Sequence, residues 1–193
     1  MNVKNYVKEE VAAVKGFLNK IGLTDYTLSK GNEEDFTGTD ILLTVNGKTL
    51  RSEVKIEDIW PYVTGNITLD AISAFSWMGR PAKVNRIFQL LPFIRIQTLG
   101  TFYQSSDDII IKMIRDIKTH RKDFFAYNIR KMKDPAFVHY VERNCNIKIN
   151  SKKSYDLDDS WESAFFCVKL DDPMLQQTEI KSLDDLTEIL EEV

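Results

Sequence analysis

Two acidic residues on either side of a tight turn are the clearest sign of chemistry in this sequence. Asn46–Gly47 is the strongest short-range signal for a β-hairpin, because both central positions of its turn need a positive φ. A two-residue turn makes Val45 face Lys48, and counting back along both strands places Asp40 opposite Glu53. Directly paired residues have Cβ atoms about 4.5–5.5 Å apart and point to the same face of the sheet.

Paired carboxylates of this kind are a candidate site for a divalent cation. Asp40 and Glu53 repel each other unless a positive charge lies between them, and a hard ion such as Mg²⁺ prefers oxygen ligands. We expect Mg²⁺, with Mn²⁺ as a substitute. Strand alternation places Lys55 on the same face as Glu53, whereas the Val54 side chain points away and only its carbonyl faces the ion.

A third acid comes from the amphipathic helix that the periodicity predicts over Val3–Ile21. Its apolar residues recur at steps of three and four, and Gly22 ends it as a C-cap. On a helical wheel Glu10 lies about 40–50° from the centre of the apolar stripe, whereas Glu9 lies roughly 140–150° away. We therefore expect Glu10 to face the sheet and Glu9 to face solvent.

The elements that must position these residues alternate along the chain. The expected strands are Tyr26–Lys30, Thr39–Val45, Lys48–Glu57, Asn66–Ser73, Phe93–Leu99, Ile147–Ile149 and Ala164–Leu170. The expected helices are Val3–Ile21, Val84–Leu91, Ser105 to about His120, Ala136–Asn144 and a last one that opens at Ser182. This order predicts an α/β fold with a central mixed β-sheet flanked by helices and a C-terminal α/β extension.

The length of 193 residues predicts one domain. We expect a core over about 3–100, a basic helical region over about 105–144 and an acidic C-terminal segment over about 156–193. Residues 156–193 hold 12 Asp/Glu and 2 Lys/Arg, and residues 1–155 hold 24 Lys/Arg and 17 Asp/Glu. A basic body with an acidic end is compatible with a nucleic-acid partner, and one hypothesis is that the acidic segment covers the basic face.

The pattern resembles the PD-(D/E)XK nuclease superfamily, which has the restriction-endonuclease-like fold. Glu10 on the first helix, Asp40 on the first hairpin strand and Glu53–Lys55 on the second carry the resemblance. Asp70 is a match for the acid that a later strand of this family often carries. The resemblance covers roughly residues 3–73, and the proline that many members have before the first aspartate is missing.

The resemblance implies a Mg²⁺-dependent endonuclease that hydrolyses phosphodiester bonds in DNA, with RNA left open as a substrate. Asp40 and Glu53 would bind one or two ions, with the Val54 carbonyl completing the shell. Lys55 would orient or deprotonate the attacking water, and Glu10 would bind through water or a second ion. Cleavage of both strands would suggest a homodimer.

Two alternatives stay open at this point. The first is a surface hairpin whose charged residues form solvated cross-strand ion pairs, since acid-x-Lys also occurs at Asp116–Lys118 and Glu179–Lys181. The second is a non-catalytic DNA- or protein-binding module on the same fold, which the acidic pI of about 5.5 favours slightly. An intact set of Asp40, Glu53 and Lys55 favours the enzyme.

A stripe of basic residues is the candidate contact to the phosphate backbone. Its members fall at helical spacing on the helix expected from Ser105: they are Lys112, Arg115, Lys118, Arg121 and Lys122. The alternative is a solvated face opposite three isoleucines.

Composition and motifs exclude several other classes of protein. The longest uncharged apolar stretch is far short of a membrane span, and Met1–Glu10 lacks the apolar core of a signal peptide, so we expect a cytoplasmic protein with no membrane partner. Cys145 and Cys167 lack the spacing of a disulfide scaffold or a zinc site. No glycine-rich phosphate-binding loop is present.

Overall fold

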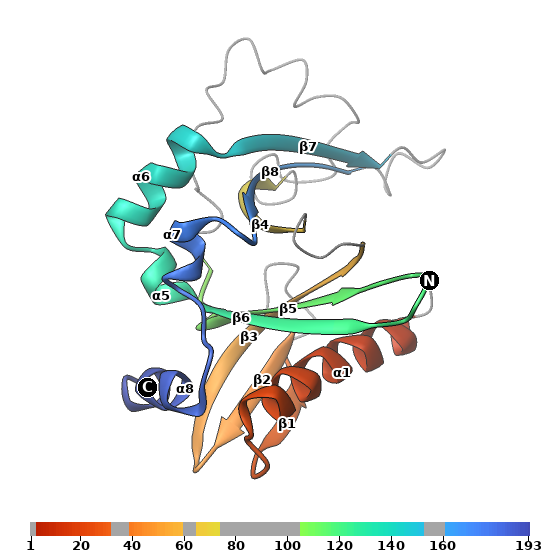
Figure 1. The fold of residues 1–193 in the computed structure, drawn as a ribbon, viewed down its shortest axis with the longest axis vertical. Helices are drawn as coiled ribbons and strands as arrows, with labels where there is room; N and C mark the ends of the chain where they lie inside the picture. The colour runs from red at the N-terminus through yellow and green to blue at the C-terminus, as the bar shows by residue number, and fades with distance from the viewer. Residues whose placement is uncertain (1–2, 32–38, 60–64, 74–104, 153–160) are drawn as a thin grey trace. The chain divides into compact units, whose positions relative to one another are not determined.

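The computed structural model describes residues 3–31, 39–59, 65–73, 105–152 and 161–193. The chain divides into two compact units, and three stretches that are distant in sequence make up the first. Unit 1 comprises Met1–Gly65, Ser106–Asp134 and Lys169–Val193, and unit 2 comprises Asn66–Ser105 and Pro135–Val168. Helices and strands alternate through both units (Figure 1), which confirms the predicted α/β class.

Unit 1 is built on a five-stranded mixed sheet in the order β1-β2-β3-β5-β6. Its strands are β1 (Thr27–Lys30), β2 (Ile41–Val45), β3 (Lys48–Asp58), β5 (Ile109–Arg115) and β6 (Lys122–Asn128). β3 and β5 run parallel, and every other neighbouring pair in this sheet is antiparallel.

The predicted hairpin and its register are confirmed. Asn46 and Gly47 have φ values of 50° and 79°, as a type I′ turn requires. Val45 pairs with Lys48, and the ladder continues as far as Ile41 opposite Ser52. β2 therefore begins at Ile41, two residues later than predicted.

Two helices cover one face of this sheet and share its apolar core (Figure 1). The first is α1 (Val3–Ile21), which buries Ala13, Val14, Phe17 and Leu18, and the second is α8 (Leu183–Glu191), which buries Leu186, Ile189 and Leu190. α1 ends in a Schellman motif, since Gly22 has a φ of 80° and the Leu23 N–H donates to the Leu18 carbonyl at 3.0 Å. Two short helices, α5 (Ile129–Met132) and α7 (Pro173–Gln176), complete unit 1.

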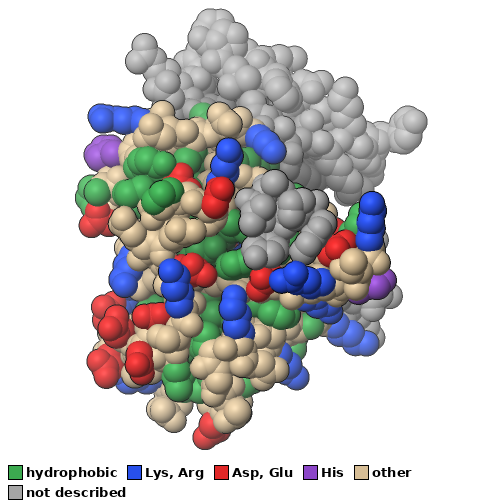
Figure 2. Space-filling view, in the orientation of Figure 1, with side chains coloured by type: hydrophobic (Ala, Val, Ile, Leu, Met, Phe, Trp, Pro, Cys, Tyr) green, Lys and Arg blue, Asp and Glu red, His purple; other side chains and the backbone are tan. Residues whose placement is uncertain are grey.

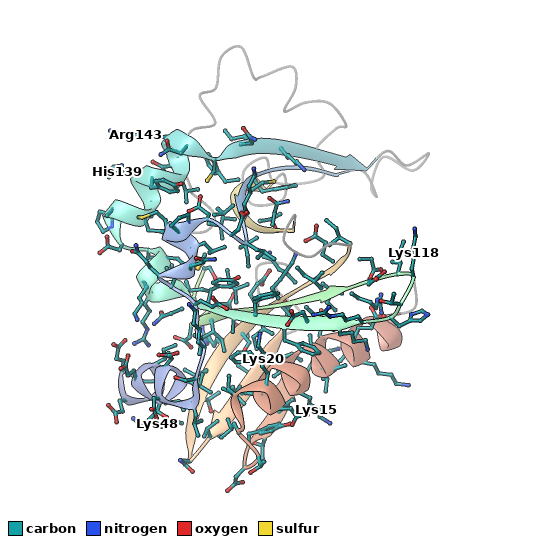
Figure 3. The ribbon with its side chains drawn as sticks, viewed as in Figure 1. Lys15, Lys20, Lys48, Lys118, His139 and Arg143 are labelled. Atoms are coloured by element: carbon teal, nitrogen blue, oxygen red, sulfur yellow. The ribbon has the colours of Figure 1, made fainter. Side chains whose placement is uncertain are left out.

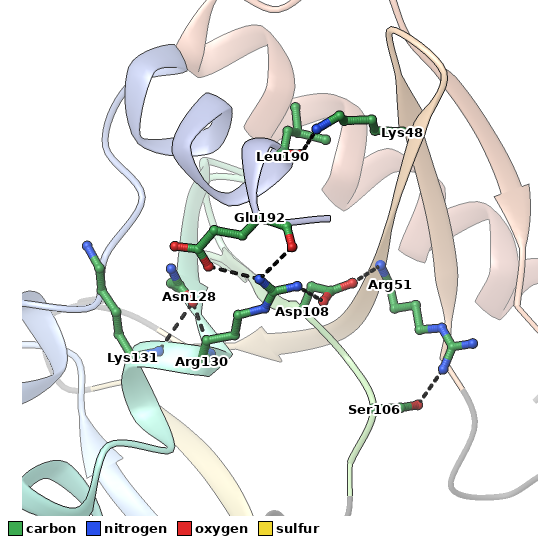
Figure 4. A network of polar contacts seen from close by, with 9 residues as sticks. All are labelled: Lys48, Arg51, Ser106, Asp108, Asn128, Arg130, Lys131, Leu190 and Glu192. Carbon is green, nitrogen blue, oxygen red and sulfur yellow. Dashed lines mark hydrogen bonds and ion pairs between the residues drawn. The ribbon is translucent and has the colours of Figure 1, made fainter.

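The acidic C-terminal helix is an integral part of unit 1. A capping box between Ser182 and Asp185 starts α8 at the predicted place, and Figure 2 shows Asp and Glu side chains gathered over it. Its C-terminal end is tied to the sheet by the Lys48 ammonium, which donates to the Leu190 carbonyl at 2.8 Å (Figure 4). Arg130 adds ion pairs to Glu192 at 2.8 Å and to Asp108 at 3.3 Å (Figure 4).

The helix predicted from Ser105 to about His120 is wrong. Strand β5 and the turn that follows it occupy this part of the chain, and Ile109, Ile110 and Ile111 are buried on both faces of β5, an interior strand of the sheet. A strand buried on both faces has no polar alternation, so its apolar residues also match helical spacing. The Asp108 carboxylate, just before β5, accepts from the Arg51 N–H at 2.9 Å.

Unit 2 holds a second sheet in the order β4-β8-β7 together with one helix. Its elements are β4 (Asn66–Ser73), α6 (Pro135–Asn144), β7 (Asn146–Lys152) and β8 (Trp161–Lys169), of which Lys169 belongs to unit 1. The predicted helix 136–144 and the strands near 66–73, 147–149 and 164–170 are confirmed. The predicted helix 84–91 and strand 93–99 lie outside the described residues.

No helix within the described ranges is both long enough and apolar enough to cross a bilayer.

Candidate functional site: a carboxylate cluster beside Lys55

Glu10 is the acid of α1 that turns toward the interior of unit 1. Its side chain lies among the buried residues of this unit, with only 5% of the residue exposed. Its neighbour Glu9 stays partly exposed and forms an ion pair with Arg115, at 3.2 Å between Oε1 and Nη1. The helical-wheel prediction is confirmed for Glu10, whereas Glu9 does not simply face solvent, because it pairs with Arg115 of β5.

Asp40 stands just before β2, where the ladder between β2 and β3 ends. Extending the register by two residues would pair Thr39 with Val54, but the Val54 N–H instead donates to the Asp40 carboxylate at 2.7 Å. The Asp40 carbonyl accepts from the Gly31 N–H at 3.0 Å. A side chain at position 31 would collide with the Thr39 carbonyl, so only glycine permits this close approach of the two backbones.

Glu53 and Lys55 point to one face of β3, as the alternation of the strand requires. The Lys55 ammonium donates to Glu53 Oε1 at 3.0 Å. The Val54 side chain between them points to the opposite face and belongs to the core. Since the N–H and C=O of one strand residue point to the same side, the Val54 carbonyl faces the edge where Asp40 lies.

The charges of the three acids act on one another. Burial, the charge of Glu53 and then that of Glu10 raise the pKa of Asp40 to about 7, against the opposing effects of the Val54 N–H and Lys55. Burial and the Glu53 charge raise the pKa of Glu10 as well, whereas Lys30 lowers it. We call Glu10, Asp40 and Glu53 the carboxylate cluster. Its members come from α1, the start of β2 and the middle of β3.

The donor set suits a hard divalent cation by charge and by ligand type. Three carboxylates and a backbone carbonyl are oxygen ligands of the kind that Mg²⁺ prefers, and a cation would relieve the repulsion that raises the pKa of Asp40. As their side chains lie in the described part of the chain, no group of three or more His, Cys, Asp or Glu residues could hold a metal ion.

The predicted basic stripe is not a helical stripe. Lys112 and Arg115 lie on β5, where residues three apart point to opposite faces of the sheet. Lys112 is buried and its ammonium lies 2.6 Å from Glu57, whereas Arg115 pairs with Asp58 at 2.7 Å. The other three members, Lys118, Arg121 and Lys122, lie in and beside the turn between β5 and β6.

Several polar neighbours of the site could not be inferred from the sequence. Lys112 pairs in register with Lys55 across β3 and β5, which requires knowing that the two strands are adjacent. Asp107 is buried and accepts from the Thr39 hydroxyl at 2.6 Å, which ties the residue before Asp40 to the start of β5. Asp70 lies on β4 in unit 2, and its side chain is outside the described part of the chain.

The raised pKa of Asp40 predicts a stability that depends on pH. An ordinary Asp loses its proton near pH 3.9, so between about pH 4 and 7 the folded chain holds a proton that the unfolded chain has lost. Stability should therefore fall as the pH rises through this range. Asp40→Asn removes the ionisation and keeps an oxygen for the Val54 N–H, so the variant should exceed the wild type in stability at pH 8 by at least about 1 kcal/mol.

Urea denaturation of both proteins at intervals from pH 4.5 to 8 measures this difference. Asp25→Asn, at an exposed aspartate of the same unit, controls for the loss of one negative charge. A difference between Asp40→Asn and the wild type that is equal at pH 5 and pH 8 would contradict the burial of an acid in this cluster.

In comparisons with known proteins, the chain matches no protein-family model, no curated protein and no solved structure.

Proposed function

We propose that this chain is a Mg²⁺-dependent nuclease with a restriction-endonuclease-like core. The observation that carries the proposal is the convergence of the carboxylate cluster and Lys55 from three separate elements of unit 1. The charge of Glu53 acts on both Glu10 and Asp40, although 43 and 13 residues separate it from them. A surface hairpin with solvated ion pairs would leave its acids exposed, whereas Asp40 and Glu53 are partly buried.

The topology of unit 1 supports the same proposal. Helix α1, strand β1, the β2–β3 hairpin and strand β5 follow one another in unit 1, which matches the order helix, strand, hairpin, strand that the resemblance implies. The parallel pairing of β3 with β5 places Glu53 and Lys55 in the interior of the sheet and not at its edge. Side chains on a central strand are held more rigidly than those on a loop, which suits a catalytic site.

The residues of the site divide the proposed work between them. Asp40 and Glu53, with the Val54 carbonyl, would hold the ion, and Glu10 would bind through water or a second ion. A bound Mg²⁺ lowers the pKa of its water and stabilises charge on the phosphate. Lys55 now pairs with Glu53, and it would move to the attacking water once that carboxylate binds the cation. From there it would orient or deprotonate the water.

The second candidate is a non-catalytic DNA- or protein-binding module on the same core. The observation that favours it is the ion pair between Lys55 and Glu53, which neutralises one acid of the cluster without any metal. In such a module the pair would be a structural contact within the sheet.

The test is an incubation of the full chain with labelled nucleic acids. Single-stranded, duplex and branched DNA, together with single-stranded RNA, are each offered with Mg²⁺, with Mn²⁺ and with EDTA. We expect cleavage of at least one DNA substrate with either metal and none with EDTA. Binding without cleavage of any substrate would favour the module.

A further inference from the structure

We propose that the turn between β5 and β6 binds the phosphate backbone of the nucleic acid at a fixed distance from the carboxylate cluster. We define the basic turn as residues Asp116–Lys122. The inference rests on the proposed function, because it takes the substrate to be a nucleic acid cleaved at the cluster. It names the element that positions the substrate, which the proposed function leaves open.

Two of the five predicted basic residues form ion pairs within unit 1. Lys112 is buried against Glu57, and Arg115 is held by Asp58 and Glu9. Because their charges are already paired with carboxylates, these two cations are poorly placed to bind phosphates. The remaining three, Lys118, Arg121 and Lys122, are all exposed and stand in or beside the basic turn.

The cations of the basic turn project from unit 1. Figure 3 shows Lys118 pointing away from the end of the hairpin, and Figure 2 shows Lys and Arg side chains gathered near this end. Lys118 and Lys122 have no ion-pair partner among the described residues. Cations that neutralise phosphates and release counterions are the main source of affinity for nucleic acid.

A buried acid fixes the shape of the basic turn. Asp116 is 3% exposed, and its carboxylate accepts from the Lys118 N–H at 2.8 Å and from the Thr119 hydroxyl at 2.6 Å. Its N–H donates to the Arg121 carbonyl at 2.8 Å, which closes the hairpin. The cations are therefore carried on an ordered backbone, so that binding would order little more than their own side chains.

An apolar side chain stands among these cations. Ile117 is 62% exposed, more than any other large hydrophobic residue that the structure describes as exposed. An exposed isoleucine beside phosphate-binding groups can pack against a base or a sugar, as apolar side chains do in proteins that contact nucleic-acid grooves.

The register of the sheet sets the distance from the basic turn to the cluster. Glu53 of the cluster lies beside Ile110 on β5, and the basic turn begins at Asp116, six residues later. At ~3.3 Å per residue this step spans ~20 Å. Since each strand of a duplex advances ~3.4 Å per nucleotide, the basic turn would contact phosphates roughly six or more nucleotides from the cleaved bond.

Binding measurements on the full chain test the basic turn. The variant Lys118→Gln/Arg121→Gln/Lys122→Gln is compared with the control Lys15→Gln/Lys169→Gln/Lys181→Gln, which removes three exposed lysines elsewhere in unit 1. A labelled duplex is titrated in EDTA between 50 and 200 mM salt. We expect the turn variant to bind at least tenfold more weakly than the wild type. The slope of log affinity against log salt should be smaller by about 2 to 3, at ~0.9 for each lost contact.

Three outcomes would overturn the inference: no binding of the duplex by the wild type, equal losses in the turn and control variants, or loss of binding to anionic phosphatidylserine vesicles with duplex binding unchanged. Both variants should melt at the temperature of the wild type, since all six side chains are exposed.

Cleavage of shortened duplexes then separates the inference from the proposed function. The turn variant should cleave as the wild type does once fewer than about six nucleotides remain on one side of the bond. A wild type that binds the duplex through the basic turn but cleaves nothing would contradict the nuclease alone. A turn variant that cleaves long and short duplexes exactly like the wild type would contradict the basic turn alone.

Discussion

Lys55→Met is expected to lower the rate of Mg²⁺-dependent cleavage by about 10²–10⁴-fold, which is the usual contribution of a positioned proton donor or acceptor. The substitution keeps most of the length of the unbranched side chain and removes the ammonium that now lies 3.0 Å from Glu53. Glu53→Gln should cause a loss of similar size, because it removes the charge that the proposed ion needs. Single-turnover cleavage of a labelled substrate measures both effects.

The chain offers matched controls for these variants. Lys181 follows Glu179 in the same acid-x-Lys spacing and lies 3.7 Å from it on the surface, so Lys181→Met should leave cleavage unchanged. Glu10→Gln should impair cleavage and Glu9→Gln should not, because only Glu10 belongs to the carboxylate cluster. Equal rates for Lys55→Met and Lys181→Met would remove Lys55 from the mechanism.

Deletion of residues 182–193 is expected to abolish the cooperative unfolding of unit 1. The deletion removes Leu186, Ile189 and Leu190, which are 0%, 2% and 7% exposed within the core. Truncation of one such side chain to alanine usually costs about 2–5 kcal/mol, and a domain is stable by only about 5–15 kcal/mol in all. Thermal unfolding followed by circular dichroism measures the loss.

The same experiment decides what the acidic end of the chain does. A helix that only covers a basic face could be removed without harm, and the truncated chain would then unfold at the temperature of the full chain. A full-length variant with Glu188→Gln and Glu191→Gln is the control, since it neutralises exposed charges of α8 and keeps its apolar face. This variant should unfold as the wild type does.

Local signals explain why half of the site could be predicted. Asn46–Gly47 fixes the hairpin and its register by turn geometry alone, and these do not depend on the rest of the chain. The orientation of Glu10 follows from the 3.6-residue period of one long helix. Both predictions use contacts that are close in sequence.

The other half depends on contacts between distant segments. β5 pairs with β3, although about 50 residues separate the two strands in the chain. Because β5 is buried on both faces, its sequence lacks the alternation of polar and apolar residues that identifies a strand. The sequence pattern therefore predicts a helix around Lys112, although this residue is a buried neighbour of Lys55 in the sheet. Asp40 lies just before β2 and forms no backbone ladder pair with β3. Its carboxylate instead accepts a hydrogen bond from the Val54 N–H.

The most direct test of the carboxylate cluster is a calorimetric titration of the full chain with Mn²⁺ at pH 7.5. We predict saturable binding by the wild type and by Glu9→Gln, and its loss in Asp40→Asn and Glu53→Gln. Absence of binding to the wild type, or binding that survives Asp40→Asn unchanged, would contradict a metal site formed by Glu10, Asp40 and Glu53.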